Sequence, residues 1–149
     1  MLRETFKLSL TALATLGLLI QLVPYGRDHS NPPVVQEPRW DRPLTRELAA
    51  RACFDCHSNK TRWPWYSHVA PVSWLVQHDV DEGRRVVNFS EWGRPYEEAG
   101  ESAETVVEGT MPPVTYLLTH PAGRLSTEEK AELVRGLNAT LGSLGTNHD

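Results

Sequence analysis

Apolar and polar positions divide the 149-residue chain into an apolar start, a proline-rich connection and a longer remainder with helical spacing. Residues 8–23 are apolar except for Ser, Thr and Gln, and Arg3 and Lys7 precede them. A helix needs about 17 to 25 such residues to span a bilayer, so this run is at the short end. It predicts one N-terminal transmembrane helix within residues 1–26. A cleaved signal peptide is the alternative, although residues 23–27 make a poor small-x-small cleavage site.

Residues 27–43 contain several prolines with Gly, Asn and Ser between them. Such a segment favours extended, stiff backbone close to the polyproline conformation. It predicts a tether between the membrane anchor and a domain that occupies residues 44–145. One domain is what a chain of this length accommodates.

Helical periodicity governs the predicted domain. Apolar residues recur at helical spacing over residues 44–52 and 71–87, residues 97–108 are acidic and helix-prone, and a further helix follows residue 126. Asp41 or Thr45 is the expected N-cap of the first helix. The expected apolar stripe of the second helix consists of Val72, Leu75, Val76 and Val80. The last helix is expected to begin with a capping box of Ser126 and Glu129 and to end at Gly142 and Gly145. The pattern predicts an all-α fold.

The charge balance limits which classes of binding partner are expected. Lys and Arg number 15 against 19 Asp and Glu, which gives a formal net charge of −4. Nucleic-acid-binding domains carry the opposite excess, so nucleic acid is not expected as a partner. Five tryptophans in so short a chain suit either a small core or a large flat ligand.

The two cysteines of the chain both lie in residues 53–57, which read Cys-Phe-Asp-Cys-His. The C-x-x-C-H spacing is typical of covalent c-type haem attachment. On one helical turn Cys53, Cys56 and His57 lie on the same side, so two thiols reach the vinyl edges of one porphyrin while the His57 imidazole reaches the iron. We therefore expect one covalent haem c, with His57 as its proximal ligand.

Two other functions use C-x-x-C. A zinc site needs two further Cys or His at comparable spacing, and the remaining histidines show no such pair. A thioredoxin-like redox pair belongs in a βαβ context, and the sequence predicts none. Both alternatives are less favoured than haem attachment.

The expected distal iron ligand is Met111, the only methionine besides the first residue. Pro112 and Pro113 hold its thioether on a stiff loop, whereas a methionine that only fills a core more often lies on a helix face. Met/His ligation is a recognised haem arrangement. His68 and His120 are alternatives, and His78 is a weaker one because it lies off the apolar stripe of its helix. Trp63, Trp65 and Tyr66 are candidates for packing on the haem or for hydrogen bonds to its propionates, and a role only in the core is an equal alternative.

Beyond C-x-x-C-H, the chain resembles the bacterial haem-binding-domain family of membrane-anchored, mono-haem c-type cytochromes. The resemblance covers about residues 31 to 141 and rests on these segments: residues 53–59, 61–67, 70–75, 82–84, 88–92, 111–113 and 120–121. It implies a cytochrome c-like helical domain that faces the periplasm behind an N-terminal anchor.

The expected function is one-electron transfer by a c-type cytochrome, because an iron with two protein ligands has no open position for substrate. The expected location is the bacterial inner membrane, crossed once, with lipid around the N-terminal helix. A redox protein or a membrane electron-transfer complex would be the partner. Two alternatives stay open, namely an accessory haem subunit of a larger membrane complex and a haem enzyme or sensor, such as a peroxidase, with an open distal position.

Overall fold

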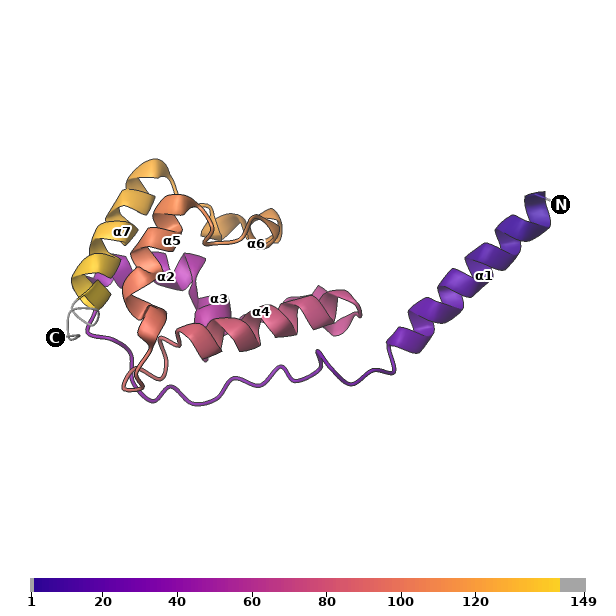
Figure 1. The fold of residues 1–149 in the computed structure, drawn as a ribbon, viewed down its shortest axis with the longest axis horizontal. Coiled ribbons are helices and arrows are strands. Elements are labelled where there is room, and N and C mark those ends of the chain that lie inside the picture. Colours follow the sequence, from indigo (N-terminus) through magenta and orange to yellow (C-terminus); the bar gives the residue numbers. More distant parts are fainter. Residues whose placement is uncertain (1, 143–149) are drawn as a thin grey trace. The chain divides into compact units, whose positions relative to one another are not determined.

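The computed structural model describes residues 2–142, and within them the regular structure is helical (Figure 1). The α-helices are α1 Leu2–Ile20, α2 Pro43–Ala52, α3 Phe54–His57, α4 Val72–Val86, α5 Ser102–Glu108, α6 Val114–Thr119 and α7 Thr127–Leu141. Three 3₁₀ helices, η1 Trp65–His68, η2 Glu97–Glu101 and η3 Pro121–Gly123, lie between them. Between Leu2 and Gly142 the β-pairing is confined to one isolated bridge, Gln36 with Glu91. The predicted all-α fold is confirmed.

The chain forms two compact units. The first unit comprises the chain up to Ser30 together with residues 63–79, and the second comprises residues 31–62 and the chain from Val80 onward. Helix α4 begins in the first unit and ends in the second. The candidate residues of the C-x-x-C-H segment and Met111 all belong to the second unit.

Helix α1 of the first unit has no buried residue. Among residues 2–142, no helix is long and apolar enough to cross a membrane. The predicted transmembrane helix is therefore not found. Arg3, Glu4 and Lys7 occupy the first two turns of this 19-residue helix, so its uncharged part is shorter than a membrane span requires.

The predicted apolar stripe of α4 is largely exposed. Val72 is 43% exposed and Leu75 is 52% exposed, and only Val80 of the predicted stripe is buried. In the first unit the buried positions of α4 are Ser73 and Gln77. The prediction was wrong because it assumed one core for the whole helix, whereas the two ends of α4 pack in different units.

The core of the second unit lies between α2, α5 and α7 and extends to the segment that follows α4. Its buried side chains are Leu48, Ala49, Phe54, Val87, Phe89, Ala99, Ala103, Val106, Leu133, Leu137 and Leu141. Helices α2 and α7 approach closely where Gly136 faces Thr45, and a Cβ at Gly136 would lie 2.1 Å from the Thr45 Oγ1 atom. This packing holds α2 in place, and α2 leads directly into the C-x-x-C-H segment.

The proline-rich segment from residue 31 onward is hydrogen-bonded to the second unit. The Val35 and Gln36 amides donate to the Ser90 carbonyl. The Glu37 carboxylate accepts hydrogen bonds from Arg46 and Lys60, and the Arg46 guanidinium above all lowers the pKa of Glu37 to about 2. Residues of the predicted tether thus line the outside of this unit.

The helix caps follow the prediction in part. The N-cap of α2 is Arg42, which makes no side-chain capping bond, so neither Asp41 nor Thr45 has the predicted role. Pro43 follows as the first helical residue, where it leaves no backbone N–H to cap. Ser126 and Glu129 form the predicted capping box of α7, and Gly142 is its C-cap. Gly145 lies outside the described residues.

Candidate functional site

The C-x-x-C-H turn, residues 53–57, follows α2 without a linker. Cys53 ends α2 and precedes α3, and its carbonyl accepts the amides of Cys56 at 3.2 Å and His57 at 2.9 Å. These two bonds close the turn predicted from the spacing. Both cysteines are half-buried, and no disulfide joins them.

The His57 ring is held by a backbone carbonyl. Its Nδ1 atom lies 3.1 Å from the Val87 oxygen. Because a carbonyl only accepts, Nδ1 carries the proton, and the lone pair of the imidazole lies on Nε2. Burial lowers the pKa of His57 below its usual value. The ring is therefore a neutral imidazole with Nε2 available to a metal, and the backbone orients it in the way that is common around metal-bound histidines.

Glycine at position 83 allows α4 to lie against the turn. A Cβ at Gly83 would lie 2.6 Å from the Cys56 carbonyl oxygen and 2.9 Å from its carbonyl carbon. Any side chain there would collide with backbone, which cannot rotate away. Gly83 thus sets the approach of α4 that brings Val87 to His57.

The Cys53 thiol lacks the lowered pKa of a redox-active cysteine. Burial, with a smaller contribution from Cys56, raises the pKa of Cys53 to about 12. Reactive C-x-x-C cysteines instead have lowered pKa values that favour the thiolate. The residues from Leu2 to Gly142 also contain no group of three or more His, Cys, Asp or Glu side chains that could hold a metal ion. The geometry supports neither the thioredoxin-like nor the zinc alternative.

Asp55 is the charged residue between the two cysteines. Its side chain is buried and has two hydrogen-bond partners. Its carboxylate accepts bonds from Arg62 (backbone N at 3.0 Å, Nε at 3.1 Å and Nη2 at 2.9 Å) and from the Tyr116 hydroxyl at 2.8 Å. Burial alone would raise the pKa of Asp55, and these hydrogen bonds bring it below its usual value. Sequence reasoning missed both Asp55 and Tyr116. The signal available was the acid inside C-x-x-C, but its partner on α6 is 61 residues away.

Met111 lies on a turn between α5 and α6. Gly109 ends α5 with a φ of 74°, and the Met111 amide donates to the Thr105 carbonyl at 3.1 Å. The Met111 side chain is on the surface, with the residue 39% exposed. Pro113 then forms the N-cap of α6. We call residues 109–113 the methionine turn.

The alternative histidine of the second unit, His120, packs on α6. Its ring stacks on Tyr116 with centroids 4.0 Å apart, and its Nδ1 lies 3.0 Å from the Tyr116 carbonyl oxygen. His120 and Tyr116 thus form a stacked pair at the end of α6.

The remaining predicted residues lie in the first unit. Trp63 stacks on His29 with centroids 4.5 Å apart, and its buried Nε1 has no hydrogen-bond partner among residues 2–142. Trp65 is 79% exposed and meets Tyr66 edge to face. His68 contacts His29 edge to face, and His78 is exposed on α4. The structure therefore groups Trp63 with His68 through His29, and it leaves Trp65 and His78 on the surface.

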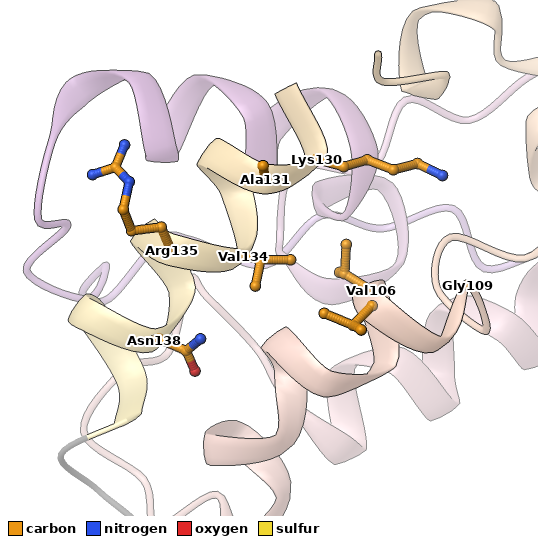
Figure 2. Close-up of a pocket in the computed structure, with 8 residues that line it drawn as sticks. Val106, Gly109, Lys130, Ala131, Val134, Arg135 and Asn138 are labelled. Atoms are coloured by element: carbon orange, nitrogen blue, oxygen red, sulfur yellow. The ribbon is translucent and has the colours of Figure 1, made fainter. Parts of the chain in front are cut away.

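A shallow groove runs between α5 and α7 of the second unit (Figure 2). Its lining is apolar in the middle and polar toward the ends, and consists of Val106, Val107, Gly109, Lys130, Ala131, Val134, Arg135 and Asn138. None of these residues belongs to α2 or α3, so this groove is separate from the C-x-x-C-H turn.

The fold and the site together define a helical protein with a C-x-x-C-H sequence on a preformed turn. The model of the haem-binding domain family matches residues 15–139, which is most of the chain. The chain therefore belongs to the haem-binding domain family, and haem is its cofactor. Comparison with curated proteins and with solved structures gave no match.

The residues present fit haem. The turn offers two thiols, one helical turn apart and outside any disulfide. The neighbouring imidazole is neutral and already oriented by Val87. Two thiols that can bond to the porphyrin edge and one neutral nitrogen that can ligate the iron are what a covalently held haem requires.

Proposed function

We propose that the protein is a c-type cytochrome, a one-electron carrier with a single covalent haem and no enzymatic activity of its own. Cys53 and Cys56 would hold the porphyrin through thioether bonds, His57 would be the proximal ligand, and Met111 the distal one. The helical second unit would then be a cytochrome c-like domain. Haem supplies, when bound, the one-electron redox chemistry of its iron.

The observation that carries this proposal is the hydrogen bond from His57 Nδ1 to the Val87 carbonyl. It fixes the tautomer and the ring orientation before any cofactor arrives. A histidine that served only the core would not need an available, neutral Nε2 beside two cysteine thiols. Val87 follows the end of α4, and Gly83 allows the close approach of that helix. The backbone thus prepares the proximal ligand.

The protein's residues tune the site in three ways. Burial of His57 disfavours its protonated form, which keeps the nitrogen ligand available at neutral pH. The hydrogen bond to Val87 raises the basicity of that ligand. A thioether as the second ligand favours the reduced iron and raises the reduction potential relative to two imidazoles.

The Met111→Ala variant tests the distal ligand. We expect it to retain covalent haem, to lose the methionine-to-iron charge-transfer band of the oxidised protein and to bind carbon monoxide readily when reduced. The reason is that alanine leaves one coordination position without a protein ligand. Absorption spectra of both redox states and a carbon monoxide titration measure these changes. Leu118→Ala, which truncates another exposed apolar side chain of the same unit, is the matched control. His120→Ala tests the alternative ligand separately. Equal spectra for wild type and Met111→Ala would show that Met111 is not the ligand.

A haem enzyme or sensor with an open distal position is the second candidate. The observation that favours it is the surface position of Met111, which is 39% exposed. The two candidates predict different spectra for the wild-type protein. High-spin iron that binds carbon monoxide or cyanide without any substitution would support the open site and contradict Met111 ligation.

We further propose that the domain works on the periplasmic side of the bacterial inner membrane, because c-type haem is attached on the outer side of energy-transducing membranes. Its partner there would be a redox protein or an electron-transfer complex. In the second case the protein could be an accessory haem subunit of that complex. Co-purification in mild detergent tests it. Isolation of the free protein alone would count against a stable complex.

Helix α1 is the proposed lipid contact. Its exposed apolar side chains include Leu13 at 66% and Leu16 at 57%. Burial of one leucine in an apolar phase contributes about 1.5 to 3 kcal/mol. We expect Leu13→Glu combined with Leu16→Glu to lower the affinity of the protein for phosphatidylcholine vesicles more than tenfold, as measured by sedimentation with the vesicles. The control places the same charges at polar positions of the helix, Thr11→Glu with Thr15→Glu, and equal losses for the two pairs would contradict insertion through the leucines.

A further inference from the structure

Helix α6 is bonded to the C-x-x-C-H turn through one side chain. This six-residue helix has no buried residue. It therefore fully buries none of the apolar side chains that normally dock a helix. Its side-chain bond to the C-x-x-C-H turn comes from Tyr116, whose hydroxyl donates to the Asp55 carboxylate at 2.8 Å and lies 3.4 Å from the Arg51 carbonyl oxygen. A polar contact, rather than a fully buried apolar side chain, joins α6 to this turn.

The Tyr116 ring is held by two neighbours. The His120 ring stacks on it with an interplanar angle of 7°. Gly123 lies on another side, where a Cβ would come within 2.9 Å of the Tyr116 Cε1 atom. Arg51 adds a bond from its Nε to the Ala122 carbonyl, which ties η3 to α2. The hydroxyl is thus directed at Asp55 by a rigid frame.

Asp55 is an equally fixed acceptor. Its side chain is 8% exposed and receives three bonds from Arg62. Hydrogen bonds to ionised groups are stronger than those between neutral groups. Asp55 lies between Cys53 and Cys56, so α6 is bonded to the same turn that carries the haem-attaching thiols.

The methionine turn connects this arrangement to the iron ligand. Its start is held by α5, through the bond from the Met111 amide to Thr105. Its end is Pro113, whose carbonyl accepts the Leu117 amide in the first turn of α6. A turn held at both ends keeps its thioether in place, whereas a turn whose second end is loose samples other positions.

We propose that Tyr116 is a positioning residue for the distal ligand, and that its bond to Asp55 holds the methionine turn in register with the C-x-x-C-H turn. This inference rests on the proposed Met111 ligation. Neither Tyr116 nor Asp55 is proposed as an iron ligand. They would fix the separation between the chain segments that carry His57 and Met111, the two proposed iron ligands. Asp55 would thus connect the segment that attaches haem to the segment that supplies the distal ligand.

The Tyr116→Phe variant tests the proposal in the haem-loaded protein. It keeps the ring and its stacking on His120 and removes only the hydroxyl. We expect covalent haem to stay on a denaturing gel, the methionine charge-transfer band to weaken, and the fraction of reduced protein open to carbon monoxide to rise about tenfold. The amides of Leu117 and His120 should exchange with solvent faster by about the same factor, while those of α7 keep their protection.

Two variants serve as comparisons. Tyr96→Phe removes a hydroxyl of the same unit that takes no part in the Asp55 cluster. It should leave covalent haem, the charge-transfer band, carbon monoxide binding and amide exchange unchanged. Asp55→Asn keeps the shape of the acceptor and removes its charge, so it should change the readouts in the same direction. In the Asp55→Asn background the additional effect of Tyr116→Phe should be smaller than in wild type.

The outcomes separate this inference from the proposed function. If Met111→Ala changes the spectrum and Tyr116→Phe leaves both carbon monoxide binding and amide exchange at wild-type levels, the positioning role is wrong and Met111 ligation stands. If Met111→Ala changes nothing, the distal-ligand assignment fails and the positioning role fails with it. Should Tyr116→Phe not fold, Asp55→Asn with unchanged readouts would equally overturn the inference.

Discussion

Haem is expected to be absent from the polypeptide on a denaturing gel when Cys53→Ser is combined with Cys56→Ser. The two thiols are the only cysteines of the chain, so no other side chain is available to form a thioether. Peroxidase-based haem staining of the gel, with protein staining of the same lanes, gives the ratio of haem to chain. We expect this ratio to fall from about one to the background level, the largest change of any substitution considered for this protein.

The two single cysteine variants are the controls for this result. Each retains one thiol on the turn, so each should keep some covalent haem, and a serine adds no bulk to the site. Serine also preserves the backbone bonds that close residues 53–57, because these bonds use main-chain atoms only. Haem that stays attached to the double variant would contradict the c-type assignment itself.

Gly83→Ala is expected to destabilise the haem-loaded protein by about 1 to 3 kcal/mol, the usual cost of overpacking. The added Cβ would lie 2.6 Å from the Cys56 carbonyl oxygen, so α4 must move away from the C-x-x-C-H turn. That movement also displaces Val87, whose amide bonds to the Gly83 carbonyl at 3.0 Å and whose carbonyl orients His57. Denaturant unfolding followed by helical circular dichroism measures the loss. The Soret absorbance followed in the same titration shows whether the haem site opens first.

Gly142→Ala is the matched control for Gly83→Ala. Gly142 has an ordinary helical φ of −64°, and a Cβ there would meet nothing within 4 Å. Alanine is favoured over glycine in a helix by about 1 kcal/mol, so a net loss at position 83 has to come from the collision. Equal unfolding free energies for the two variants would show that α4 does not depend on this close approach.

Local sequence signals were sufficient where the structure is local. The C-x-x-C-H turn closes through bonds between residues three and four apart, and the capping box of α7 joins Ser126 to Glu129. Such contacts depend on spacing alone, so a single sequence predicts them. The predicted N-cap of α2 was wrong for an equally local reason, because Pro43 begins the helix one residue earlier than the apolar pattern indicated.

Contacts between distant segments were not predictable from the sequence. The stripe of α4 was assigned to one core. The structure instead buries Ser73 and Gln77 in the part of the helix that belongs to the first unit, and Val80 where the second unit begins. A hydrophobic pattern records which residues are apolar, and it does not record that a helix changes partners along its length. The expected membrane span was not found. Three charged residues lie within the helix, and its uncharged part is too short to cross a bilayer.

By itself the sequence determined the helical class of the protein and its family resemblance, and it singled out the residues that are proposed to attach and ligate haem. Their chemistry follows from residue type and short-range spacing. Only the tertiary structure decided which carbonyl orients His57, which glycine admits α4, and that Tyr116 bonds to Asp55. The physical reason is that each of these contacts joins segments at least 27 residues apart. Backbone packing brings such segments together, and a pattern along the chain does not specify it.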